Sequence, residues 1–125
     1  MRPLLDTHTL LWWLEDPRLL SEEARNAVRN GKNVVYVSAA VVWEIVIKKS
    51  LAKLDAPDNI EKVLATNRFL PLSITIAHVL TLQALPLFHK DPFDRIIVAQ
   101  SICEGLTVVS RDPNIGQYPV AFLLA

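Results

Sequence analysis

Cysteine is almost absent from this sequence of 125 residues, which contains only Cys103. A single cysteine excludes a disulfide within the chain and a cysteine-rich zinc site. Because proteins of oxidising compartments commonly carry disulfides, we expect this chain to work in the reducing cytoplasm. The acid at position 6 also interrupts the apolar beginning of the chain, which a signal peptide does not tolerate.

Glycine is scarce too, with residues only at positions 31, 105 and 116. Loops that cradle nucleotide phosphates need several glycines within a few positions, so the sequence excludes a P-loop and a dinucleotide-binding fingerprint. Long apolar runs are also missing. The longest, around residues 10–14 and 41–47, are far shorter than the roughly 20 residues of a membrane-spanning helix.

A surplus of basic residues is the third absence, since 13 Lys and Arg balance 13 Asp and Glu. Proteins that bind nucleic acid tightly and without specificity usually carry such a surplus. Its absence still allows an enzyme that holds nucleic acid briefly, through a bound metal and a few local cations. Hydrophobic residues make up 51% of the chain, which is enough to build a core and argues against disorder.

Short apolar runs alternate with longer segments of helical periodicity, which is typical of βα units. The expected strands are residues 4–5, 34–37, 69–72, 106–109 and 120–124, and the expected helices are residues 7–14, 22–30, 39–51, 58–67, 74–85 and 92–104. We therefore predict a single domain, residues 1–125, of the α/β class. Its central parallel sheet of about five short strands has helices on both faces. Binding sites of such sheets lie beyond the carboxyl ends of the strands.

Four carboxylates are placed for such a site. Asp6 directly follows the first strand, and Asp112 follows the fourth. Asp94 lies at the beginning of the helix that leads into the fourth strand, and Glu44 interrupts an otherwise apolar helix. Grouped carboxylates repel one another unless a divalent cation lies among them. Mg²⁺ and Mn²⁺ prefer such oxygen ligands, and they activate water for phosphodiester cleavage.

Each acid also has a purely structural interpretation. Asp6 and Asp91 are suited to cap helices, Asp94 favours the positive end of a helix, and Asp112 fits a turn or cap before a proline. Glu44 has Lys48 four residues later, which favours an exposed ion pair. The joint placement of the carboxylates, more than any one of them, favours a metal site.

Other polar and aromatic residues carry weaker signals. His89 has two interpretations, contact with the site or packing in a loop, and its sequence context favours the loop. Trp12 and Trp13 fit core or interface positions better than base-stacking ones. A further group of cations is interpreted as a solvated face, some of which would hold phosphates if the site is real. These cations are Lys48, Lys49, Lys53, Arg95 and Arg111.

Four sequence blocks, residues 4–12, 38–48, 89–100 and 106–112, occur in an order that resembles the PIN-domain ribonucleases, specifically the VapC-type toxins of toxin–antitoxin pairs. The most specific block is the His-x-Asp-Pro-Phe-Asp-Arg motif at residues 89–95. Two positions depart from the family pattern. Val41 replaces a small hydroxyl residue that many relatives carry, and Ala52 stands where glycine is common.

The resemblance implies a PIN-like three-layer α/β/α fold and an acidic quartet of Asp6, Glu44, Asp94 and Asp112. It implies Mg²⁺ or Mn²⁺ as the cofactor, with Asp6 and Asp94 as direct ligands. Asp91 would support the ligands from behind, and three hydroxyl residues would orient ligands or water. These are Thr7, Ser38 and Ser110. The family also implies RNA as substrate, a homodimer and a small antitoxin that blocks the site.

Two other functions remain open from the sequence. A catalytically silent PIN-like interaction module would keep the scaffold to bind a partner, although the intact quartet argues against it. A phosphoacceptor signalling domain shares the length and the parallel sheet. That class needs paired acids after the first strand, whereas Asp6 is followed by Thr7 and His8.

Overall fold

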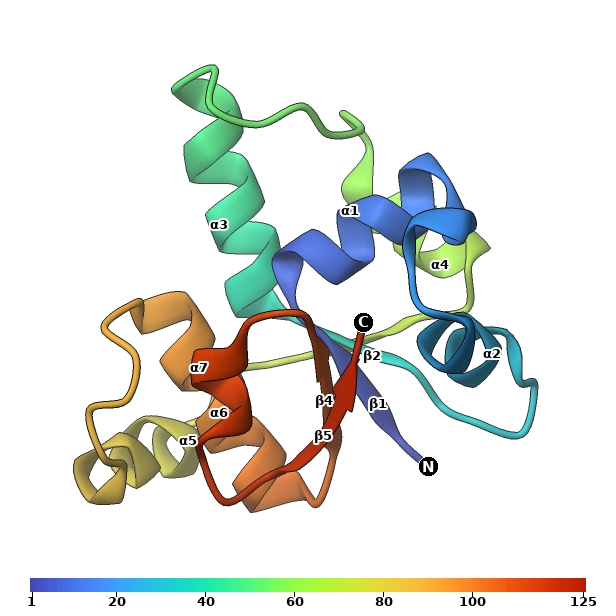
Figure 1. Ribbon diagram of the computed structural model, residues 1–125. Helices are drawn as coiled ribbons and strands as arrows, with labels where there is room; N and C mark the ends of the chain where they lie inside the picture. Colours follow the sequence, from blue (N-terminus) through green and yellow to red (C-terminus); the bar gives the residue numbers. More distant parts are fainter.

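A parallel sheet of five short strands forms the centre of the computed structural model, which describes residues 1–125 (Figure 1). Its strand order is β3-β2-β1-β4-β5, and every neighbouring pair is parallel. The strands are β1 (Pro3–Leu5), β2 (Tyr36–Ser38), β3 (Leu70–Leu72), β4 (Thr107–Ser110) and β5 (Ala121–Leu124). The predicted α/β class and sheet are confirmed.

Helices cover the sheet on both sides. Figure 1 shows α1, α2 and α4 on one side and α5 and α6 on the other, with α3 extending from the end of β2. None of these helices is long and apolar enough to cross a bilayer. Their bounds are α1 (Thr7–Glu15), α2 (Glu22–Arg29), α3 (Ala39–Ser50), α4 (Ile60–Thr66), α5 (Ile76–Thr81), α6 (Pro92–Glu104) and α7 (Pro113–Gly116), with 3₁₀ turns η1 (Pro17–Leu19) and η2 (Leu82–Ala84).

The strand order reverses beside β1. From β1 the chain adds β2 and β3 on one side, and it then returns to add β4 and β5 on the other. Because β1 and β4 are neighbours and parallel, the residues that follow them emerge side by side. This reversal point is where open α/β sheets commonly bind ligands, and it brings Asp6 close to Ser110 and Asp112.

Burial of both faces of the sheet explains why the strands consist of consecutive apolar residues. Leu4, Leu5, Val108 and Val109 are fully buried, because helices pack against both faces of a parallel sheet. They belong to a cluster of 22 buried hydrophobic residues that extends into α1, α3 and α6. The site residues at the strand ends are thus attached directly to the buried core.

Some element boundaries differ from the predictions. The second strand begins at Tyr36, two residues later than predicted, and Val34 lies on the surface with 40% of its area exposed. The helix predicted for residues 74–85 is shorter, since Thr75 caps α5 and the chain tightens into η2 after Thr81. The short elements η1 and α7 were not predicted.

Candidate active site

Asp6 lies between the end of β1 and the beginning of α1, and only 6% of its surface is exposed. Its Oδ1 accepts the backbone N–H of Thr9 at 2.9 Å, which caps α1 as the structural interpretation expected. Its Oδ2 accepts a hydrogen bond from the hydroxyl of Ser110. Asp6 therefore caps α1 while its carboxylate stays at the carboxyl ends of the strands.

Glu44 extends from α3 and is 4% exposed. Its Oε1 accepts a hydrogen bond from Oγ1 of Thr7, and its Oε2 pairs with Nζ of Lys48. The ion pair expected from the sequence exists, but the carboxylate half of it is buried, which corrects the exposed pair of that interpretation. The hydrogen bond to Glu44 raises the pKa of Lys48, so this cation stays charged beside the site.

Asp91 and Asp94 sit at the beginning of α6. Asp91 caps the helix, and its Oδ1 accepts the amides of Phe93 at 2.8 Å and of Asp94 at 3.1 Å. The side chain of Asp94 is 18% exposed. One of its oxygens, Oδ2, faces His89, while Oδ1 accepts no hydrogen bond from the protein. An unpaired oxygen on a mostly buried carboxylate is suited to a cation.

Asp112 follows β4 and caps α7. Its Oδ1 accepts the amide of Asn114 at 2.9 Å, and its own N–H donates to Oγ of Ser110 at 3.0 Å. Ser110 therefore accepts a hydrogen bond from Asp112 and donates one to Asp6. This buried hydroxyl therefore links the carboxylate of Asp6 to the backbone of Asp112 through one atom.

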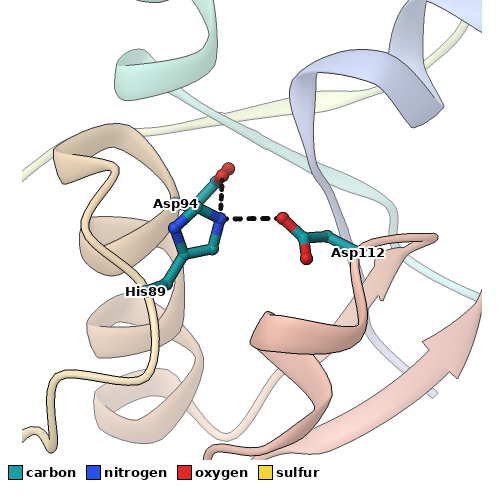
Figure 2. Close-up of side chains that lie close together, drawn as sticks. All are labelled: His89, Asp94 and Asp112. Carbon is teal, nitrogen blue, oxygen red and sulfur yellow. Dashed lines mark hydrogen bonds and ion pairs between the residues drawn. The ribbon is translucent and has the colours of Figure 1, made fainter.

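His89 corrects a prediction, because it does not simply pack in a loop. Figure 2 shows its ring between Asp94 and Asp112, with Nε2 facing both carboxylates. Nε2 is 2.7 Å from Oδ2 of Asp112 and 3.0 Å from Oδ2 of Asp94. The histidine of the motif at residues 89–95 was the available signal. Its partner Asp112 lies 23 positions away, beyond the reach of local pattern reasoning.

All four predicted carboxylates line one cavity of about 240 Å³. They reach it from four different elements, which only the folded chain brings together. Ser38 is not among the lining residues, because its hydroxyl caps α3 by accepting the N–H of Ala40. The full set of lining residues is Asp6, Thr7, His8, Trp12, Glu44, Lys48, His89, Asp91, Asp94, Arg111 and Asp112.

Cationic and aromatic side chains line the same cavity. The guanidinium carbon of Arg111 lies 4.1 Å from the ring centroid of Trp12, and the ring of His8 stacks against the same indole at 5.8 Å. Trp12 packs against the core as predicted, yet it also lines the cavity. Trp13 is purely structural, since it packs on Phe69 and donates to Asn67.

Only two of the five cations singled out from the sequence reach the cavity, namely Lys48 and Arg111. Lys49 pairs with Asp58 on the surface. Arg95 donates to the backbone oxygen of Pro86 at 2.9 Å, so it holds the preceding loop instead of facing the carboxylates. Lys48 and Arg111 are thus the two cations of this group at the cavity, where Lys48 pairs with Glu44 and Arg111 also donates to the backbone oxygens of Leu19 and Ala125.

The electrostatics of the site fit a divalent cation. Burial and the charges of Asp91, Asp6 and Glu44 raise the pKa of Asp94 from 3.8 to about 7, although His89 opposes the shift. Burial raises the pKa of Asp6 as well, despite its hydrogen bonds from Ser110 and Thr9. Negative charge is costly here without a counter-ion, and the donors are the carboxylate oxygens that Mg²⁺ and Mn²⁺ bind.

Comparison with known proteins places this geometry in a family context. A family model described as "PIN domain" matches residues 4–121. The chain is 30% identical over 118 residues to Ribonuclease VapC22 of Mycobacterium tuberculosis, an alignment that covers 87% of this chain and 85% of the relative.

Two solved structures share the fold. One is VapBC2 of Rickettsia felis bound to a DNA fragment from its promoter, with a TM-score of 0.71, 14% identity and 98% of each chain covered. The other is a toxin–antitoxin complex from Klebsiella pneumoniae, with a TM-score of 0.67 and 18% identity. That alignment covers 98% of this chain and 96% of the other.

Proposed function

This chain belongs to the PIN domain family, and we propose that it is a divalent-cation-dependent endoribonuclease whose active site is the acidic cavity at the carboxyl ends of β1 and β4. The observation that carries the proposal is the convergence of Asp6, Glu44, Asp94 and Asp112 on one cavity. The 30% identity to a ribonuclease over most of both chains supports RNA cleavage as the reaction.

Asp94 and Asp6 would hold Mg²⁺ or Mn²⁺, and Glu44 and Asp112 would bind it directly or through water. When bound, such an ion lowers the pKa of a coordinated water and offsets the charge that develops on the phosphate. The protein positions the carboxylates around the phosphodiester, and one of them accepts the proton of the attacking water. Thr7 and Ser110 keep Glu44 and Asp6 oriented through their hydroxyls.

The cationic and aromatic residues of the cavity would bind the RNA. Lys48 and Arg111 supply positive charge for the phosphates that flank the cleaved bond. The exposed ring of His8, already stacked on Trp12, offers a flat surface for a base. Because these groups are few, the neutral net charge of the chain is compatible with brief RNA binding.

We also propose that the chain acts in the cytoplasm as the toxin of a toxin–antitoxin pair and assembles with a small antitoxin and with a second copy of itself. The shared fold with toxin–antitoxin complexes supports the antitoxin. Exposed apolar side chains on α5, such as Ile76 at 78% and Leu80 at 55% exposure, support a further protein contact.

Cleavage of a mixed cellular RNA pool by the purified chain tests the proposal, with Mg²⁺, with Mn²⁺ and with a chelator. We expect metal-dependent cuts that disappear in Asp94→Asn and persist in Asp58→Asn. Asp58 is a suitable control because it is a surface carboxylate paired with Lys49. Tight metal binding by a folded, partner-free protein that cuts no RNA would instead favour the silent interaction module.

A further inference from the structure

We propose that His89 is a positioning residue of the active site, which holds Asp112 and Asp94 in place through its Nε2–H group and does not itself ligate the cation. The inference rests on the proposed function, because it concerns the same cavity. It starts from the contacts that fix the imidazole ring on both of its nitrogen atoms.

The first contact sets the position of the proton on the ring. The backbone N–H of Asp91 lies 3.1 Å from Nδ1 of His89 and donates to it. A backbone amide can only donate, so Nδ1 must present its lone pair. The neutral ring then carries its proton on Nε2, which makes Nε2 a hydrogen-bond donor.

The second contact uses that proton. Nε2–H donates to Oδ2 of Asp112 at 2.7 Å, and Oδ2 of Asp94 lies 3.0 Å from the same nitrogen (Figure 2). Asp94 belongs to α6 and Asp112 caps α7, so two carboxylates from separate elements meet at one N–H group. The partial positive charge of this group offsets part of their mutual repulsion.

The same tautomer argues against direct ligation. His89, Asp94 and Asp112 have potential ligand atoms within 4.8 Å of one another, which resembles a mixed nitrogen and oxygen metal site. A metal-binding imidazole needs a bare nitrogen facing the metal. If Nε2 became bare, the proton would move to Nδ1 and oppose the N–H of Asp91. Direct ligation by His89 would therefore break a hydrogen bond at the beginning of α6.

Neighbouring contacts hold the imidazole ring of His89 in this orientation. Asp91 is fixed because it caps α6 through two amide contacts. The backbone N–H of His89 donates to the hydroxyl of Tyr118 at 3.0 Å, and that hydroxyl also accepts Nη1 of Arg95 at 3.1 Å. Tyr118 is only 3% exposed. Main chain and ring are thus anchored together, as expected of a residue that orients others.

Oδ1 of Asp94 remains available under this arrangement, because His89 contacts Oδ2. The cation would then be held by carboxylate oxygens alone, with His89 behind them. Residues that orient metal ligands in this way typically contribute 10- to 100-fold to metal affinity.

The test is calorimetric titration of the metal-free protein with Mn²⁺, comparing wild type with His89→Leu, His89→Gln and His78→Leu. We expect His89→Leu to weaken Mn²⁺ binding about 10- to 100-fold. His89→Gln should recover most of the loss, because its amide nitrogen places a donor near the position of Nε2. His78→Leu is the matched control, because Nε2 of His78 also contacts a carboxylate, that of Glu104 at 2.8 Å, but His78 does not line the cavity. This variant should bind Mn²⁺ as wild type does.

Pulsed electron paramagnetic resonance of the Mn²⁺-loaded wild type separates positioning from ligation. We expect no coupling from a directly bound nitrogen. A nitrogen coupling that disappears in His89→Leu would overturn the proposal in favour of ligation. Unchanged Mn²⁺ affinity in His89→Leu would also overturn it, while metal-dependent RNA cleavage by wild type would leave the proposed function standing. Failure of wild type to bind Mn²⁺ would instead reject the metal site itself.

Discussion

The hydroxyl of Ser110 donates a hydrogen bond to Oδ2 of Asp6, although the two residues are 104 positions apart in the chain. Ser110 ends β4 and Asp6 follows β1, so the parallel pairing of these strands creates the contact. The hydroxyl oxygen of Ser110 also accepts a hydrogen bond from the backbone N–H of Asp112. One buried hydroxyl therefore holds the carboxylate of Asp6 and the backbone of Asp112, two residues of the proposed site.

We predict that Ser110→Ala lowers both Mn²⁺ affinity and RNA cleavage by about 10- to 100-fold, because Asp6 and Asp112 lose their shared partner. It should also lower the free energy of unfolding by about 1–3 kcal/mol, the usual result of leaving buried groups unpaired. Titration calorimetry, cleavage rates and urea denaturation measure the three effects.

Ser101→Ala is a matched control for this change. Its hydroxyl is also buried, but it donates to the backbone oxygen of Leu106, away from the carboxylates. We expect a similar loss of stability with no change in Mn²⁺ affinity. Equal losses of affinity in both variants would show that Ser110 acts only through general stability.

Local signals predicted α6 to the residue. Asp91 as N-cap, Pro92 at the first helical position and Gly105 in the left-handed conformation, with φ of 65°, are signals that act within a few residues. The alternation of apolar strands and helices likewise predicted the parallel sheet. Both predictions use hydrophobic periodicity and capping residues, which can be recognised from residues close together in the sequence.

Contacts between distant segments were not predictable in this way. The position of Asp6 after a strand was visible, but its hydrogen bond from Ser110 depends on the pairing of β1 with β4. The site contact of His89 required the turn at Asp112 to fold back across it. Thr75 capped α5 with His78 in place of the usual Glu or Gln, so the shortened helix had no familiar signal.

The raised pKa of Asp94 gives a prediction for stability against pH. A carboxyl with a folded-state pKa of about 7 and an ordinary value of 3.8 favours folding most when it is protonated. Its contribution is complete below pH 3.8 and is lost as the pH rises through 7. Without divalent cations, we expect Asp94→Asn to unfold at a higher temperature than wild type at pH 8. The raised pKa corresponds to no more than about 4 kcal/mol.

The difference between Asp94→Asn and wild type should shrink as the pH falls to 5, because protonation removes the charge from Asp94 in the folded wild type. At pH 8, Mg²⁺ or Mn²⁺ should also remove the difference in unfolding temperature, because the ion stabilises wild type alone. Thermal unfolding at both pH values, with chelator and with metal, measures these effects. A variant that is less stable than wild type at pH 8 in chelator would contradict the origin proposed for the raised pKa.

Ala52 offers a prediction that is independent of the site. It follows α3 with φ of 55°, a left-handed conformation that costs a residue with a side chain about 1–2 kcal/mol. We predict that Ala52→Gly raises the free energy of unfolding by about 0.5–1 kcal/mol in urea denaturation, since glycine's greater freedom when unfolded cancels part of the gain.

Ala65→Gly is the matched control for that change, because Ala65 lies on the exposed face of α4 in ordinary helical conformation. It should lower stability by about 1 kcal/mol. Cleavage rates should be unaffected by both variants. A loss of stability in Ala52→Gly equal to that in Ala65→Gly would show that the left-handed conformation of Ala52 costs the folded protein no free energy.

The aromatic residues that line the cavity allow an effect on substrate binding to be separated from an effect on the chemical step. His8 is exposed, stacks on Trp12 at 5.8 Å and makes no hydrogen bond to a carboxylate. If its ring supports a base, His8→Ala should raise KM for a single-stranded RNA about 5-fold or more, because one base stack contributes about 1–3 kcal/mol. Its kcat should change little, since the carboxylates stay in place. His8→Phe, which keeps a flat ring without charge, should restore most of the affinity. Loss of affinity in both variants would assign the effect to charge, and a fall in kcat with unchanged KM would place His8 among the groups that act on the reacting phosphate.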